Sequence, residues 1–381
     1  MRAIIFSALA AFALAAPSIA QAPKPAPEHV KLDPKEGDFV VKDFKFKDGE
    51  TLASMNLHYA TLGAPHRNTK GEVDNAVLIM HGTGGDWKQF LRPQFADVLF
   101  APGGLLDPAK YYIILRDGIG HGKSSKPSDG MHARFPRYDY DDMVTADHEL
   151  LTKGLGVGHA RLIMGTSMGC MHSFVWGEMY PDFMDALMPL ACLPTAIVGR
   201  NRTWRSLIIQ AVKNDPAWKG GDYTSQPVEA LRTAAALQLV AGGAPIVMQI
   251  DYPTREKADE YARSYTENYL KTTDANDLIY QFDASRNYDP SRDLEKIKAP
   301  LTWVNSADDF INPPELGLAE QFAKRLKTGK FVLIPASKDT HGHGTHTWAA
   351  IWKGHLEALL KRSGPTSMKT AAKPIAKPKG Q

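Results

Sequence analysis

The chain has 381 residues, of which 43% are hydrophobic and 23% are charged, and its formal net charge is only +3. This length and hydrophobic content suit a soluble globular protein with a core large enough for an extended α/β sheet. The mild charge gives no support to a nucleic-acid partner, because part of it comes from four lysines near the C-terminus (Lys369, Lys373, Lys377 and Lys379).

The first twenty residues have the pattern of an export signal. Arg2 supplies a charged start, Ile4 to Ala16 form an apolar run, and Ser18-Ile19-Ala20 is a small-x-small cleavage site. The apolar run is too short for a stable membrane-spanning helix. We therefore predict a signal peptide over residues 1–20, export to a bacterial periplasm and no stable membrane anchor after cleavage.

Changes in composition and periodicity divide the rest of the chain. Residues 21–36 are rich in Pro, Ala and Lys and are predicted to be a linker, and residues 363–381 a basic disordered tail. Strand and helix signals alternate over 37–195 and return over 289–362, which together are predicted to form one catalytic core. Between these segments, residues 196–288 show helical periodicity without strand signals, which predicts an inserted helical lid.

The core segments have the pattern of an α/β fold. Asp48-Gly49 predicts a hairpin turn between two antiparallel strands, 39–46 and 51–62. Apolar runs then alternate with helix-like segments, which implies a mainly parallel sheet with helices on both faces. The expected strands are 76–80, 111–116, 160–164 and 186–191, and the expected helices are 88–100, 138–154 and 168–180.

A glycine-rich stretch, His-Gly-Thr-Gly-Gly at residues 81–85, follows the first of these strands. Such loops present backbone N–H groups either to a developing oxyanion or to a phosphate. No G-x-G-x-x-G pattern and no Walker-type lysine accompanies the stretch, so nucleotide binding is disfavoured.

Residues 165–169 read Gly-Thr-Ser-Met-Gly, a G-x-S-x-G motif between an apolar run and a helix-like stretch. The pattern predicts a strand, a sharp turn and a helix, with Ser167 at the turn as a nucleophile. Glycines tolerate a strained backbone there, and the helix N-terminus favours developing negative charge. A capping serine in a structural turn would show the same residues, so the prediction depends on an acid and a histidine downstream.

Two cysteines occur, Cys170 just after the motif and Cys192 at the end of an apolar stretch. In an oxidising compartment they could form a disulfide. Both are expected in buried elements, where free cysteine packs as a small hydrophobic residue. Pairing stays open at this point, and two free thiols are the favoured expectation.

Aromatic residues are prominent in the predicted lid. Trp204, Trp218 and Tyr223, together with Met248, are candidates for the lining of an apolar substrate pocket. The alternative is that they form the core of the lid, which is the commoner role of such side chains.

Asp308 and Asp309 follow an apolar run at 301–304 that is predicted to be a buried strand. In an open parallel sheet, sites form just beyond the carboxyl ends of the strands. Either aspartate could therefore act as a catalytic acid, and either could cap the helix that Pro313 opens.

Three histidines, His341, His343 and His346, follow a strand at 331–334 and precede a helix at 348–360. A catalytic base has to be neutral at working pH and lie on a loop that reaches the serine. His343 is flanked by glycines, whereas His346 falls at the start of the helix and His341 precedes the turn. The H-x-H-x-x-H spacing matches no recognised zinc site, so no metal is expected.

The order of these motifs resembles the α/β-hydrolase superfamily. Residues 92–95, 117–122, the G-x-S-x-G motif and Asp-Pro-Ala-Trp at 215–218 look like the homoserine O-acetyltransferase family, over about residues 40–360. The resemblance implies an α/β-hydrolase fold with an eight-stranded, mainly parallel sheet and a helical lid. It also implies transfer of an acetyl group from acetyl-CoA to homoserine through an acyl-serine.

By the same resemblance, Ser167 is the nucleophile, Asp309 the acid, through an Asp-x-Ile-x-Pro pattern, and His343 the base. The backbone N–H groups of Thr83 and Met168 are the expected oxyanion-hole donors.

One departure from the family concerns the acceptor. The acetyltransferases carry an arginine before a Gln-Ala-Ile sequence, where this chain has Ile209, so a cation for an amino-acid carboxylate is missing there. Because acetyl-CoA is a cytoplasmic metabolite, an exported relative is expected to hydrolyse carboxylic esters, with water as acceptor. Two alternatives stay open: an O-acyltransferase that uses acetyl-CoA or another acyl donor, and a non-catalytic ligand-binding relative. We expect a small-molecule ester or acyl substrate and no cofactor, and association into a homodimer stays open.

Overall fold

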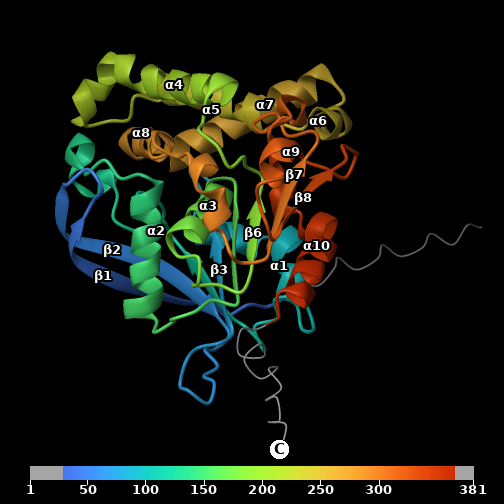
Figure 1. Ribbon diagram of the computed structural model, residues 1–381. Helices are drawn as coiled ribbons and strands as arrows, with labels where there is room; N and C mark the ends of the chain where they lie inside the picture. Colours follow the sequence, from blue (N-terminus) through green and yellow to red (C-terminus); the bar gives the residue numbers. More distant parts are fainter. Residues whose placement is uncertain (1–28, 365–381) are drawn as a thin grey trace, which may run out of the picture.

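A computed structural model describes residues 29–364 (Figure 1). The predicted signal peptide lies outside these residues, as do most of the predicted linker and tail. Two predicted boundaries are wrong. The first strand begins at Lys35, within the predicted linker, and Ser363, assigned to the tail, is buried at the end of the last helix. The Ser363 hydroxyl accepts a hydrogen bond of 3.0 Å from Arg161.

The centre of the molecule is an eight-stranded sheet with the order β1-β2-β4-β3-β5-β6-β7-β8. β1 and β2 form an antiparallel hairpin, β2 is antiparallel to β4, and all later neighbours are parallel. The predicted mainly parallel sheet is therefore confirmed. The strands are β1 (Lys35–Lys45), β2 (Thr51–Leu62), β3 (Ala76–Met80), β4 (Tyr112–Arg116), β5 (Leu162–Thr166), β6 (Leu187–Leu190), β7 (Leu301–Ser306) and β8 (Gly329–Ile334).

Helices cover both faces of the sheet, and the central strands are buried on both sides (Figure 1). In β3, Leu78 and Met80 pack in one apolar layer with α2, α3 and α9, while Val77 and Ile79 pack in the other with α1 and α10. This alternation is the period of two expected of a strand, with apolar residues on each face. The helices are α1 (Pro93–Leu99), α2 (Tyr140–Glu149), α3 (Met168–Met179), α9 (Leu318–Ala323) and α10 (Ala349–Arg362).

Five helices lie between β6 and β7, in the segment predicted to be a lid, and no strand occurs between residues 196 and 288. They lie over one end of the sheet, at the top of Figure 1, and share a small apolar core that includes Ile208, Leu231 and Phe282. In the described part of the chain no single helix has the length and hydropathy to cross a membrane, although α5 and α6 reach that level as a pair bent by 105°. The lid helices are α4 (Gly199–Asn214), α5 (Val228–Gly242), α6 (Pro245–Asp251), α7 (Arg255–Thr272) and α8 (Ala275–Asp283).

A disulfide joins Cys170 to Cys192, so the expectation of two free thiols is wrong. Cys170 lies in the first turn of α3, and Cys192 lies just after β6. Because β5 and β6 are neighbours in the sheet, the helix that follows β5 starts beside the segment that follows β6. The bridge therefore fastens the start of α3 to the end of the adjacent strand.

Candidate active site

Ser167 lies in a sharp turn between β5 and α3, as the motif predicts. Its backbone has φ 54° and ψ −106°, a strained conformation for a residue with a side chain. The flanking glycines have a different role from the expected one, because neither has a positive φ. A Cβ atom on Gly165 would lie 2.3 Å from the Gly169 carbonyl oxygen, and one on Gly169 would lie 2.1 Å from that of Met80. The strain is carried by Ser167 itself, and the glycines allow the turn to pack against α3 and β3.

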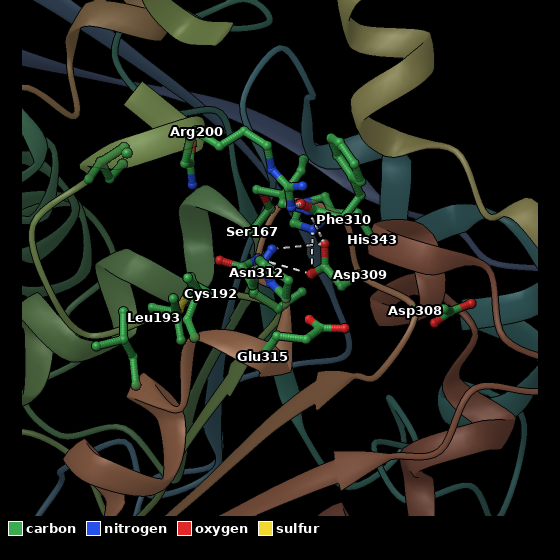
Figure 2. Close-up of a pocket in the computed structure, with 18 of the residues that line it drawn as sticks. Ser167, Cys192, Leu193, Arg200, Asp308, Asp309, Phe310, Asn312, Glu315 and His343 are labelled. Carbon is green, nitrogen blue, oxygen red and sulfur yellow. Dashed lines mark hydrogen bonds and ion pairs between the residues drawn. The ribbon is translucent and has the colours of Figure 1, made fainter. Parts of the chain in front are cut away.

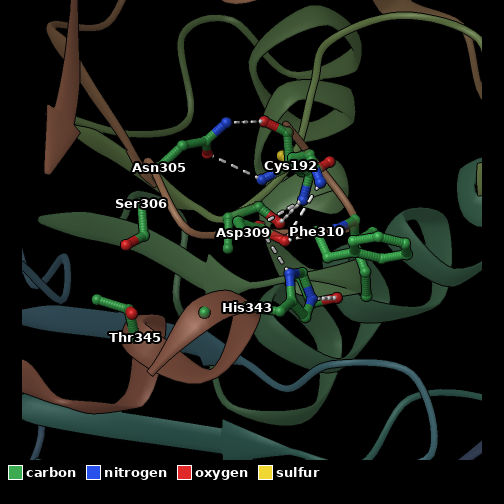
Figure 3. A network of polar contacts seen from close by, with 12 residues as sticks. Cys192, Asn305, Ser306, Asp309, Phe310, His343 and Thr345 are labelled. Carbon is green, nitrogen blue, oxygen red and sulfur yellow. Dashed lines mark hydrogen bonds and ion pairs between the residues drawn. The ribbon is translucent and has the colours of Figure 1, made fainter. Parts of the chain in front are cut away.

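The structure brings Ser167, His343 and Asp309 into one hydrogen-bonded chain. His343 Nε2 lies 2.8 Å from Ser167 Oγ, and His343 Nδ1 lies 2.9 Å from Asp309 Oδ2. The second contact is drawn in Figure 3. Since an ionised carboxylate only accepts, Nδ1 carries the proton, and Nε2 is free to accept the serine hydroxyl proton. This is the arrangement required for general-base activation of a serine.

Asp309 is fully enclosed, and several donors compensate its charge. Burial raises the pKa of the Asp309 carboxyl, but His343, the Asn312 amide and the Ile311 N–H outweigh burial, so the pKa lies below its ordinary value. Asn312 Nδ2 donates to Asp309 Oδ2 over 2.9 Å and to the Ala191 carbonyl over 3.2 Å. Asn312 was not recognised in the sequence, where its position three residues after the acid was the only available signal.

Asp308, the other acid candidate, has a different position. Its carboxylate accepts hydrogen bonds from the Thr340 hydroxyl (2.8 Å) and the Gly342 N–H (3.0 Å), and also contacts the Ser306 hydroxyl. These partners lie at the end of β7 and in the loop that carries His343. Asp308 therefore holds the histidine loop, while Asp309 contacts the histidine itself.

The two remaining histidines of the cluster do not contact Ser167. His341 stacks on Trp348 with ring centroids 3.8 Å apart. His346 is enclosed, and burial lowers its pKa to about 3, so it stays neutral. Among the described residues, no group of three His, Cys, Asp or Glu side chains is arranged to hold a metal ion.

The glycine-rich loop packs against the nucleophile. A Cβ atom on Gly82 would lie 3.3 Å from Ser167 Cβ, so the loop passes close to the serine. Met168 is the first residue of α3, where backbone N–H groups have no partner within the helix. The geometry is compatible with the expected oxyanion donors, Thr83 and Met168.

A cavity of about 1010 Å³ opens beside Ser167 and His343, between the sheet and the lid (Figure 2). Its walls are largely apolar and include Met171, Leu193, Leu239, Val240, Met248 and Ile311. It also contains a charged residue that the sequence did not single out. Arg205, one helical turn before Ile209, is 3% exposed and donates to Asn201 (2.9 Å) and Ser285 (3.2 Å).

The lid aromatics are not among the residues that line this cavity. Trp204 packs edge-on against Phe282, Trp218 donates to Asn276 over 2.8 Å, and the Tyr223 hydroxyl donates to Asp274 over 2.7 Å. The structure thus places Trp204, Trp218 and Tyr223 in the lid core, the alternative role, and only Met248 of that group at the cavity.

Comparison with known proteins agrees with this fold. Residues 75–339 match the model of the α/β hydrolase fold family. A probable acyltransferase of Methanothermobacter thermautotrophicus is 30% identical over 73% of this chain and 84% of its own length. A homoserine O-acetyltransferase of Pelobacter propionicus is 28% identical over 87% of this chain and 98% of its own length.

Solved structures give the same architecture. An acetylester hydrolase from Corynebacterium glutamicum has a TM-score of 0.75 at 20% identity, over 86% of this chain and 96% of that protein. At this identity the likeness concerns the fold. The chain is therefore a member of the α/β hydrolase fold family and an enzyme of the group related to the homoserine O-acetyltransferases.

Proposed function

We propose that this protein is an esterase that hydrolyses small carboxylic esters through an acyl intermediate on Ser167. The hydrogen-bonded chain of Asp309, His343 and Ser167 is the observation that carries the proposal. His343 takes the hydroxyl proton as Ser167 attacks the ester carbonyl, and the buried Asp309 carboxylate stabilises the resulting imidazolium. Each well-placed oxyanion donor contributes roughly 3 to 4 kcal/mol to such a transition state.

The second half of the reaction uses the same groups. His343 returns its proton to the departing alcohol and then deprotonates a water molecule, which attacks the acyl-serine carbonyl. As the bond from the acyl carbon to Ser167 Oγ breaks, His343 gives this proton to Oγ and the acid is released. The apolar wall of the cavity suits an uncharged acyl or alkoxy group.

The test is intact-mass analysis after incubation with a fluorophosphonate, together with turnover of short-chain p-nitrophenyl esters. We expect one covalent adduct and ester turnover in the wild type, and neither in Ser167→Ala. A folded wild-type protein without an adduct would overturn the proposal and favour a non-catalytic, ligand-binding role.

O-acyl transfer is the second candidate, and Arg205 favours it. A buried guanidinium on the cavity wall can pair with a carboxylate on an acceptor or an acyl group. Acyl transfer predicts that the acyl-serine formed from acetyl-CoA or an activated ester is consumed faster when a carboxylate-bearing alcohol is added. Product analysis by mass spectrometry separates the transferred ester from free acetate.

We further propose that the protein is exported, as the pattern in residues 1–20 predicts. The Cys170–Cys192 disulfide supports this, because such bonds persist in oxidising compartments and are rare in the cytosol of mesophiles. N-terminal sequencing of the protein from a periplasmic fraction tests it. A mature N-terminus near Gln21 is expected, and uncleaved protein confined to the cytoplasm would refute it.

A further inference from the structure

His81, the first residue after β3, connects a buried charged network to the glycine-rich loop. The side chain is fully buried, and both ring nitrogens have partners. Nε2 lies 3.1 Å from Arg116 Nη1 and 3.1 Å from the Gly118 nitrogen, while Nδ1 lies 2.8 Å from the Gly82 carbonyl oxygen.

These partners determine the tautomer of His81. A guanidinium and a backbone N–H can only donate, so Nε2 has to be the unprotonated acceptor. The single proton of the neutral ring is then on Nδ1 and is donated to the Gly82 carbonyl. Burial, together with the nearby Arg116 and His121, lowers the pKa of His81 well below its ordinary value, so the ring stays neutral.

The Gly82 carbonyl is held by two donors, because the Gly85 N–H also donates to it over 3.0 Å. This carbonyl and the Thr83 N–H belong to the same peptide unit. In a planar trans peptide the C=O and N–H bonds point in opposite directions, so fixing one direction fixes the other. Donation to the carbonyl also polarises the peptide, which strengthens its N–H as a donor.

The nucleophile turn is tied to the same residue. The Gly169 N–H donates to the His81 carbonyl over 3.1 Å, next to Met168, which carries the other expected donor. The His81 backbone therefore fixes the spacing between the glycine-rich loop and the start of α3.

Arg116 is itself held in one position. At the end of β4, its Nε donates to Asp147 on α2 over 3.0 Å, and its Nη2 lies 2.7 Å from His172 Nδ1 on α3. Both members of the Arg116–Asp147 pair are buried, so removal of either would leave an uncompensated charge. These contacts fix the guanidinium of Arg116 in the position from which it donates to His81.

We propose that Arg116 and His81 are positioning residues that aim the Thr83 N–H at the oxyanion of the tetrahedral intermediate. This role rests on the proposed acyl-serine chemistry. Arg116 sets the His81 tautomer, His81 orients the Gly82–Thr83 peptide, and that peptide contacts the developing charge.

The first test compares His81→Leu with His81→Asn. Leucine removes the donor to the Gly82 carbonyl, whereas an asparagine amide can place an N–H near the position of His Nδ1. For His81→Leu we expect kcat to fall about 10- to 100-fold with little change in KM, because oxyanion donors act on the transition state. His81→Asn is expected to recover most of the loss.

A second measurement on the same variants distinguishes a positioning role of His81 from a purely structural one. The affinity for a boronic acid, which forms a tetrahedral adduct with a serine, should fall in parallel with kcat/KM. The affinity for the carboxylic acid product, which forms no tetrahedral adduct, should change little. Equal losses for product and adduct, or no loss for His81→Leu, would overturn the proposal.

The tautomer provides a test that needs no variant. In the wild type labelled with ¹⁵N-histidine, the His81 ring should be protonated at Nδ1 and bare at Nε2 from about pH 5 to 8. Protonation at Nε2 would overturn the proposal even if His81→Leu failed to fold. A wild type that forms no serine adduct would instead refute the proposed function. In that case Arg116 and His81 would have no oxyanion donor to position.

Discussion

Removal of the Cys170–Cys192 disulfide should destabilise the protein strongly while sparing the geometry of its site. The perturbation is the double variant Cys170→Ala/Cys192→Ala, since both sulfur atoms are buried and alanine adds no polar group. The bridge spans 22 residues of sequence. The loss of chain entropy that such a loop imposes on the unfolded state predicts about 3 kcal/mol of stability.

Activity should survive below the unfolding transition. The turn at Ser167 is also held by the Ser167 N–H, which donates to the Leu190 carbonyl over 2.8 Å, and by the Gly169 N–H on the His81 carbonyl. These bonds do not involve sulfur. We therefore expect kcat/KM of the double variant within a few-fold of the wild type at low temperature.

The assay is guanidinium unfolding followed by tryptophan fluorescence, with and without a phosphine reductant. The oxidised wild type should be about 3 kcal/mol more stable than the double variant, and reduction should remove that difference. The double variant is the matched control, because reductant should leave its unfolding curve unchanged. Alkylation of both thiols in denatured, unreduced wild type, or equal stability of the two oxidised proteins, would refute the reasoning.

Three further predictions concern the site and its supports. Asp309→Asn should lower kcat by about 10³- to 10⁴-fold in stopped-flow acylation assays, because an amide can hold His343 in the wrong tautomer. A loss of less than about tenfold would contradict this expectation. Gly169→Ala should yield little folded protein by circular dichroism, since its Cβ would collide with the backbone of β3. Burial, with the negative Asp293, raises the pKa of Glu178 to about 8 from 4.5, so the folded protein favours the protonated carboxyl. The free energy of unfolding is therefore highest below about pH 4.5 and falls as the pH rises towards 8. Glu178→Gln should therefore gain up to a few kcal/mol relative to the wild type between pH 5 and 9 in urea unfolding, and parallel pH profiles would refute this.

The order of strands and helices along the chain could be predicted from local sequence patterns. Apolar runs such as Leu162 to Met164 predict buried strands, and the G-x-S-x-G motif predicts the turn that presents Ser167. Both depend on a few adjacent residues, so sequence alone determines them. The same holds for the absence of strands between residues 196 and 288, which marked the lid.

The identity of the acid needed more than local pattern. Asp308 and Asp309 are adjacent and follow the same strand, and resemblance to a family favoured Asp309. Only the folded chain shows that one carboxylate contacts His343 while the other holds the histidine loop. The side chains of these two adjacent residues point in different directions. Which of them reaches the catalytic histidine depends on where the distant loop that carries His343 lies.

Contacts between distant segments were beyond the sequence. The pairing of Cys170 with Cys192 follows from the adjacency of β5 and β6, and the position of Arg205 on the cavity wall follows from how α4 packs. The lid aromatics were misplaced for the same reason, since composition does not tell which face of a helix meets the sheet. Sequence thus determined the elements, the serine and the small sets of candidate acids and bases, because these depend on local pattern. Tertiary structure decided the partners, because burial and hydrogen bonding depend on which distant segments meet.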